Sequence, residues 1–173
     1  MAIWPFQPSR ASEDAECLLA AVTEASRRPA LFASGRIPDT LEGRFEAMAL
    51  YAGLAMIRLS AERGAEPLAQ HFADKLFRAY DAGLREAGVG DLAVAKRMRG
   101  LAGAFYGRLE AYGAAVRAGD KLGLSAALGR NVFADEAHAY APVLAEHVLA
   151  TVRAQAEAPL AALFAQSGWP QPE

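Results

Sequence analysis

The sequence predicts an all-α fold, a single-domain bundle of about six helices. Three observations lead to this prediction. Apolar residues recur three and four positions apart over most of the chain, alanine and leucine dominate, and no segment shows the two-residue alternation of a strand. The chain of 173 residues is long enough for one domain with a substantial core. We assign residues 1–10 to an N-terminal arm, 11–166 to the helical domain and 167–173 to an irregular tail.

The first half of the domain contains three predicted helices. The first begins at Ser12 and closes near Arg28, and a proline-bounded loop follows over residues 29–38, with Leu31, Phe32 and Ile37 expected to anchor it to the core. The second begins with a capping-box pattern in which Asp39 is the expected cap, and it ends near Gly64. The third follows Pro67 and ends at Gly88. The inward stripe of the second helix is predicted to comprise Leu41, Phe45, Met48, Ala52, Ala55 and Leu59.

The second half begins with a tight turn at Gly88 and Gly90, for which both glycines are expected to adopt a positive φ. Asp91 is predicted to cap a long helix that runs to Gly119. A short helix over residues 122–128 follows, and a last helix extends from about residue 135 to the break at Pro159. The inward stripe of the long helix comprises Val94, Met98, Leu101, Phe105, Leu109, Tyr112 and Val116.

Three glycines lie on the opposite side of the long helix, at positions 100, 103 and 107. Each glycine inside a helix costs roughly 1 kcal/mol relative to alanine, so three on one face call for a reason. Either another helix of the same protein packs closely against Gly100, Gly103 and Gly107, or this face receives a helix from a partner, or the glycines reflect only an Ala/Gly-rich composition.

The long helix also carries a local excess of basic residues, because no acid occurs between Asp91 and Glu110. The basic residues are Lys96, Arg97, Arg99 and Arg108. These side chains can meet acidic groups on a partner protein, lipid phosphate or ribosomal RNA. The alternative is that Arg99 and Arg108 pair with acids of the same chain, for which the candidates are Asp81, Asp91 and Glu42.

No local pattern predicts catalysis, a metal site or a cofactor. The histidines are His71, His138 and His147, and none forms a His-Glu-x-x-His pair. His138 and His147 would point about 180° apart on a continuous helix. Cys17 is the only cysteine, and no Gly-x-Ser-x-Gly motif is present. We therefore expect a non-enzyme, with no catalytic residue, metal or cofactor.

Charge and hydropathy restrict the expected location and partners. The chain has 18 basic and 20 acidic residues, a net charge of −2, which gives no overall attraction to DNA. It has neither a long apolar run nor the pattern of a signal peptide, so we predict a cytoplasmic protein. Trp4 and Phe6 in the arm either contact a membrane interface or fold back over the domain.

Four blocks of sequence together resemble the ubiquinol–cytochrome c chaperone family, over roughly residues 27 to 135. The blocks are Pro38-Asp-Thr-Leu-Glu-Gly-Arg-Phe-Glu46, Gly88-Val-Gly-Asp91 with Val94, Lys96 and Met98, Ala104-Phe-Tyr-Gly-Arg108 with Tyr112, and Ala127-Leu-Gly-Arg-Asn131. The resemblance implies a helical, non-catalytic assembly factor for the ubiquinol–cytochrome c reductase (cytochrome bc1) complex. Mitochondrial relatives act with a second protein, near the ribosomal exit tunnel, on newly made cytochrome b.

Combining the resemblance with the long helix, we predict that a respiratory subunit such as cytochrome b binds around this helix. The ribosome, a second assembly factor and the periphery of the inner membrane are further expected contacts. The alternative is a helical small-molecule-binding regulatory domain. The predicted client-binding residues are Asp91, Lys96, Arg97, Arg99, Gly100, Gly103, Tyr106, Gly107 and Arg108.

Overall fold

A computed structural model describes residues 10–172 and confirms the all-helical fold class. The described residues form six α-helices and four short 3-10 or π turns, and no strand occurs among them. In chain order the helices are α1 (Arg10–Ser26), α2 (Leu41–Ser60), α3 (Glu66–Glu86), α4 (Asp91–Ala118), α5 (Lys121–Leu128) and α6 (Ala141–Glu157). The short turns are Pro29–Phe32, the π turn Gly129–Phe133, Leu160–Phe164 and Gln166–Gly168.

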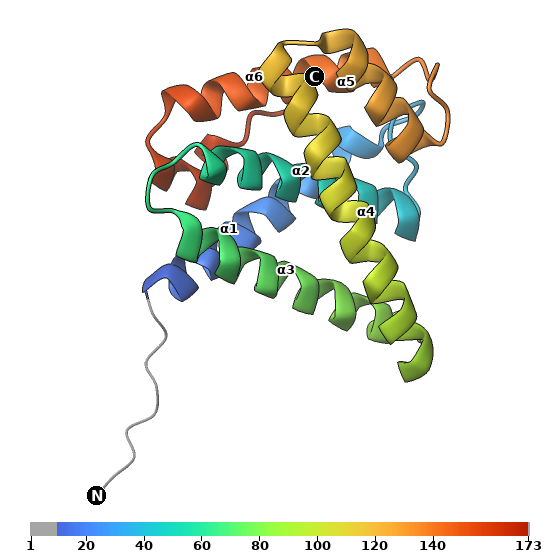
Figure 1. The fold of residues 1–173 in the computed structure, drawn as a ribbon. Helices are drawn as coiled ribbons and strands as arrows, with labels where there is room; N and C mark the ends of the chain where they lie inside the picture. The colour runs from blue at the N-terminus through green and yellow to red at the C-terminus, as the bar shows by residue number, and fades with distance from the viewer. Residues whose placement is uncertain (1–9, 173) are drawn as a thin grey trace, which may run out of the picture.

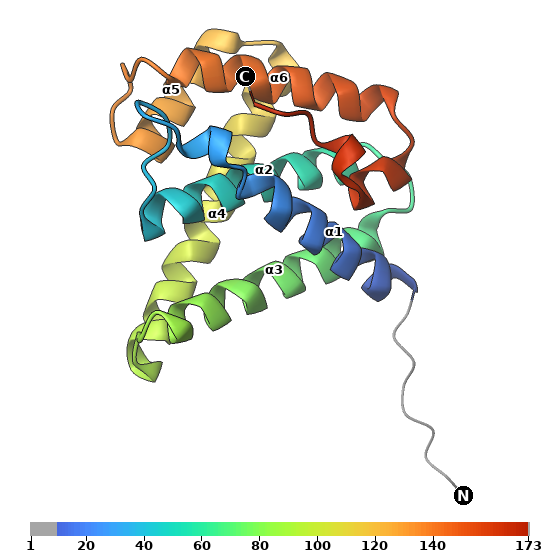
Figure 2. The ribbon, with the colours of Figure 1, turned by 180° about the vertical axis from the view of Figure 1, so that it is seen from behind.

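Helix α2 lies at the centre of the bundle. It contacts α1, α3, α4 and α6, and the two opposite views show helices on several sides of it (Figures 1 and 2). A helix enclosed in this way buries more than one face. Leu50 and Leu54 are therefore as deeply buried as Leu59, although they lie off the predicted stripe, and the inclusion of Leu41 in that stripe was wrong because it is 47% exposed.

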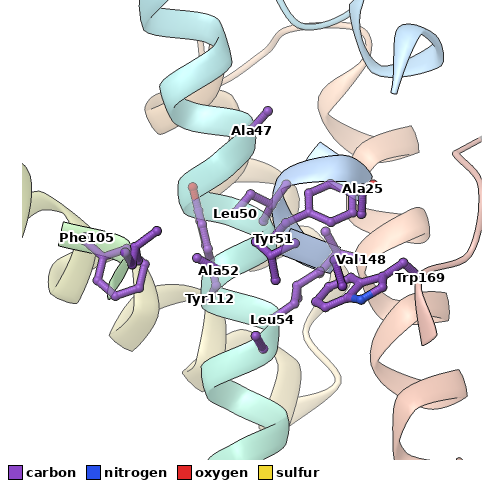
Figure 3. Packing of buried hydrophobic residues seen from close by; sticks show 14 of the residues in the cluster. Ala25, Ala47, Leu50, Tyr51, Ala52, Leu54, Phe105, Tyr112, Val148 and Trp169 are labelled. Atoms are coloured by element: carbon purple, nitrogen blue, oxygen red, sulfur yellow. The ribbon is translucent and has the colours of Figure 1, made fainter. Parts of the chain in front are cut away.

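The core around α2 combines large aromatic rings with alanines. Tyr51 is fully buried, and its ring centroid lies 5.7 Å from that of Trp169 in the C-terminal segment. Phe105 and Tyr112 of α4 approach α2 from another side (Figure 3). Small side chains such as Ala52 let the neighbouring helices come close to the α2 backbone.

The C-terminal segment, residues 166–172, begins with the 3-10 turn Gln166–Gly168 and is part of the core. Trp169 is only 1% exposed, and the segment contacts α1 and α6 (Figure 2). The buried guanidinium of Arg28 holds it by donating to the carbonyl oxygens of Trp169 and Pro170, at 2.7 and 2.6 Å, and to Gln166 Oε1 at 2.7 Å. These bonds satisfy donors that would otherwise be buried without a partner.

Several helix boundaries differ from the predictions for local reasons. Thr40, and not Asp39, caps α2, because its hydroxyl accepts from the backbone N–H of Gly43 while Asp39 pairs with Arg44. Helix α6 begins only at Ala141, where a proline occupies the first turn. His138 therefore precedes the helix, and the expectation of one continuous helix through His138 and His147 was wrong.

The region around α5 follows the prediction at its start and departs from it at its end. The side chain of Asp120 accepts from Gly123 N–H at 2.8 Å and caps α5, and Gly119 ends α4 with φ of 64°. The chain then continues beyond the expected end as the π turn, until Ala134 takes φ of 52°. The proline-bounded loop is anchored as expected, with Leu31 and Ile37 buried in the core.

Residue 10, which was assigned to the arm, is the first residue of α1, and the rest of the predicted arm lies outside the described residues. The aromatic residues of the arm, Trp4 and Phe6, lie outside the described residues. Among the helices of residues 10–172, none is both long and apolar enough to span a bilayer.

Candidate protein-binding surface

The joint between α3 and α4 lies at one end of the bundle, and α4, which carries the predicted site, runs from it across the bundle (Figure 1). Gly88 takes φ of 80°, and the N–H of Val89 donates to the carbonyl of Leu84 at 3.0 Å, which closes α3. Gly90 is extended, with φ of −67°, and it is the residue at the N-cap of α4. The prediction of a positive φ at Gly90 was therefore wrong.

Asp91 does not cap α4, contrary to the prediction, because it is the first residue of the helix and makes no capping bond. Its carboxylate accepts from Arg85 Nη1, and Arg85 Nε donates to Asp81 at 2.6 Å. Asp91 thus ties the start of α4 to the end of α3. Arg85 thus occupies Asp81 and Asp91, which are two of the three acids that were considered as partners of Arg99.

The inward stripe of α4 is confirmed. Val94, Phe105 and Tyr112 are buried, and the other four residues of the stripe are partly buried. Phe105 packs edge-on against Phe77 of α3, with the ring centroids 5.8 Å apart. This packing fixes which side of α4 faces outward, because the helix period of 3.6 leaves a single solvent face.

The glycines lie on that solvent face. Gly100, Gly103 and Gly107 are exposed, and a Cβ atom added to any of them would meet nothing within 4 Å. The interpretation that another helix of this chain packs closely there was therefore wrong. Glycine lowers helix stability relative to alanine, and no contact within the described part of the chain requires glycine at these three positions.

Three of the four basic residues are also unengaged. Lys96, Arg97 and Arg99 are exposed and form no ion pair with any residue of 10–172. They give the first half of α4 a positive surface next to the glycines. Pairing of Arg99 with an acid of the same chain is not seen.

Arg108 has a different environment. It makes a bidentate pair with Glu46 of α2, with Nε–Oε2 and Nη2–Oε1 distances of 2.8 and 2.6 Å, and both side chains are about one-fifth exposed, at 20% and 21%. Burial raises the pKa of Glu46, and the charge of Arg108 opposes this shift. Arg108 pairs with an acid of its own chain, as one alternative held, but the acid is Glu46 and the pair joins α2 to α4.

A groove of about 320 Å³ runs along the edge of α4 and is open to solvent. Its lining is mainly apolar, and Arg97 and Glu42 are the charged residues in it. Leu41 is exposed in this groove, although the sequence pattern assigned it to the core. The lining residues are Leu41, Glu42, Phe45, Leu84, Arg97, Gly100, Leu101 and Ala104.

The groove residues of α2 and α3 were not predicted as part of the site. Leu41, Phe45 and Leu84 have the spacing of ordinary core residues, and only the way α2, α3 and α4 meet brings them together along a groove. Tyr106 was predicted and is 49% exposed, but it lies at the edge toward α3, with its ring 6.0 Å from Phe77. The outer face of α4 thus lies between the groove and Tyr106.

The described residues contain no group of three side chains that could hold a metal ion. The nearest feature to a polar centre is the pair Tyr51 and His147, whose Oη and Nε2 atoms are 2.9 Å apart in the core. Burial lowers the pKa of His147 to about 4, with a further contribution from the charge of Arg28. The histidine is neutral at physiological pH and stabilises the packing between α2 and α6.

Comparisons with known proteins agree with the fold and with the family that the sequence resembles. A crystal structure of the Cbp3 homolog from Brucella abortus is similar, with a TM-score of 0.79 and 38% sequence identity over 91% of this chain and 88% of that chain. No curated protein matches the sequence. The profile of the family described as "Ubiquinol-cytochrome C chaperone" matches residues 33–168, which include α2 to α6 and the whole of the groove. The chain therefore belongs to the ubiquinol–cytochrome c chaperone family.

Proposed function

We propose that this protein is an assembly chaperone for the ubiquinol–cytochrome c reductase complex and that it holds an unassembled subunit, such as cytochrome b, at the surface of α4. The observation that carries the proposal is family membership over most of the domain, together with an uncovered helix face beside an apolar groove. A membrane subunit outside the bilayer presents apolar helices, which need an apolar surface of this kind to shield them.

The geometry supports a polypeptide client. The groove is open to solvent and mainly apolar, which suits the apolar face of a partner helix. The uncovered glycines permit close approach of a client backbone to α4, and Lys96, Arg97 and Arg99 are available for acidic groups. Arg108 holds the α4 wall of the groove against α2 through Glu46. Asp91 acts in the same supporting way through Arg85.

The alternative of a small-molecule regulator has less support. A ligand site is normally an enclosed pocket with a few convergent polar groups, whereas this groove is open and its lining is mainly apolar. A second assembly factor, the ribosome and the inner-membrane surface are further contacts that the proposal allows at the basic part of α4.

The first test reverses two charges on the outer face. The double variant Lys96→Glu/Arg99→Glu should fold normally, because both side chains are exposed. We expect it to capture roughly tenfold less client, since each exposed charge contact contributes up to about 1 kcal/mol and both are reversed. The measurement is the amount of cytochrome b that co-purifies with the tagged protein from its own cells, together with the level of assembled complex.

The matched control reverses two exposed arginines elsewhere, in the variant Arg63→Glu/Arg153→Glu. This control changes net charge by the same amount and should retain client and complex. A folded Lys96→Glu/Arg99→Glu variant with the control's level of cytochrome b and complex would show that the client binds at another surface.

A further inference from the structure

The outer face of α4 has a line of residues along it that no other part of the described chain covers. At 100° per residue, Lys96, Glu110 and the flanking Leu92 and Ala114 fall within about 20° of the direction of Gly103. Leu92 is 93% exposed, and the others are also exposed. In Figure 1, α4 crosses in front of α2, and no element lies in front of it.

The charges on this face are separated along the helix. Lys96 lies before Gly103 and Glu110 after it, and neither forms an ion pair with any described residue. They are about 21 Å apart at 1.5 Å per residue, so they cannot pair with each other in one chain. Both charges are thus available to a partner.

We infer that α4 pairs with α4 of a second copy of this chain, in an antiparallel arrangement with the twofold axis at Gly103. The two charges are equally spaced about this glycine, seven residues before it and seven after it. A twofold axis there sets Lys96 of each copy opposite Glu110 of the other, and both ion pairs form at once. Charge complementarity therefore selects a second copy as the occupant and fixes the antiparallel direction.

The other residues of the face fit the same arrangement. Gly100 of one copy comes opposite Gly107 of the other, so no side chain separates the backbones at the crossing. The interaxial distance can therefore lie at or below the lower end of the usual 8–10 Å. Leu92, which is almost fully exposed in one chain, comes opposite Ala114 and is covered. Arg99 reaches the region of Tyr106 and Glu110 of the other copy.

Self-pairing covers the same residues through which the client is proposed to bind. If the proposed function holds, the dimer protects the glycine face, and the client must displace one copy to reach it. This consequence rests on the proposed function, whereas the dimer itself does not. Because a single helix supplies the contact, we expect a small interface with a dissociation constant in the micromolar range.

The dimer is tested by sedimentation velocity of the purified chain over a concentration series to roughly 100 µM, a range suited to micromolar affinity. We expect a reversible dimer. The variants Lys96→Glu and Glu110→Lys should each raise the dissociation constant of the dimer about tenfold. Each variant places two like-charged pairs where the original chain has two opposite-charge pairs. An equimolar mixture of the two variants restores both opposite-charge pairs and should dimerise like the original protein. The control Arg153→Glu should not alter dimerisation.

A steric variant tests the crossing point without changing charge. Gly103→Leu should fold, since a Cβ there meets open space, and it should be monomeric because the two leucines would collide at the axis. A chain that is monomeric throughout the series overturns the inference. A dimer that survives Gly103→Leu, or a mixture of charge variants that stays monomeric, also overturns it.

The variant Glu110→Lys separates this inference from the proposed function. Its dimer should be about tenfold weaker, yet it retains Lys96 and Arg99, so its capture of cytochrome b should equal or exceed that of the original chain. Loss of client binding in Lys96→Glu/Arg99→Glu together with its retention in Glu110→Lys supports both conclusions. If Glu110→Lys instead loses client binding, self-pairing does not compete with the client. This conclusion holds whatever the mixture of the two charge variants shows.

Discussion

Tyr51 and His147 join α2 to α6 through one partly buried hydrogen bond. Burial raises the pKa of Tyr51 and lowers that of His147 to about 4, so both side chains are uncharged at neutral pH. The ring of Tyr51 also packs against Trp169, which links the pair to the C-terminal segment. At the residue scale this pair therefore makes the core sensitive to acid.

We expect the free energy of unfolding to fall as the pH is lowered from about 6.5 to about 4. The unfolded histidine takes up a proton near its ordinary pKa of 6.5, whereas native His147 stays neutral until about pH 4, so protons bind preferentially to the unfolded chain. The stabilising contribution is complete above pH 6.5 and is lost through this window. Urea unfolding at a series of pH values measures it.

The variant His147→Gln is the control for this pH dependence, because its neutral amide can still bond with Tyr51 but does not titrate. Its stability should change less with pH across the window than that of the original chain. Equal slopes for the two proteins would assign the pH dependence to other groups, since only the difference between the slopes reports on His147.

At the scale of the element, α4 combines a face that is needed for folding with a face that is not. Its inward stripe packs against α2 and α3, whereas its outer glycines contact nothing within the described chain. A solvent-exposed glycine in a helix lowers stability relative to alanine. The structure thus separates the contribution of α4 to the fold from its proposed contribution to binding.

Gly103→Ala should raise the free energy of unfolding by about 0.5–1 kcal/mol, because it removes backbone entropy from the unfolded chain and its Cβ enters open space. Chemical denaturation at one pH gives the value. The matched change Gly43→Ala on α2 should destabilise, since the added Cβ would collide with the carbonyl oxygen of Pro38. If Gly103→Ala were also destabilising, the outer face of α4 would have to be covered.

At the scale of the whole molecule, the end of the chain closes the bundle. Trp169 is buried in the core, and its Nε1 donates to Leu163 O at 3.0 Å. Arg28 near the end of α1 binds the same segment, so it connects residues 141 positions apart. The irregular C-terminal segment therefore contributes to the stability of the whole domain.

Trp169→Ala should lower the free energy of unfolding by about 3–5 kcal/mol, because it removes the large buried ring and leaves a cavity against Tyr51. The matched variant Leu122→Ala removes an apolar side chain that is 83% exposed and should change stability by about 0.5 kcal/mol or less. Thermal and urea unfolding of both variants provide the comparison. A similar small effect for both would mean that the C-terminal segment is dispensable for folding.

Some features could be predicted because they depend on residues close together in sequence. The inward stripe of α4, the turn at Gly88 and the cap at Asp120 follow from helix period, glycine and side-chain capping. The cap of α2 was placed one residue too early, since Asp39 and Thr40 are both good caps and the pairing of Asp39 with Arg44 decided between them.

The sequence by itself determined the all-α class, the order of the helices and the inward face of α4, because the helix period relates residues only a few positions apart. Only the tertiary structure decided that Gly103 faces open space, that Arg108 binds Glu46 and that Leu41 and Leu84 line a groove. These facts depend on how α2, α3 and α4 meet. Such packing is set by contacts between residues far apart in the chain, which a local pattern does not encode.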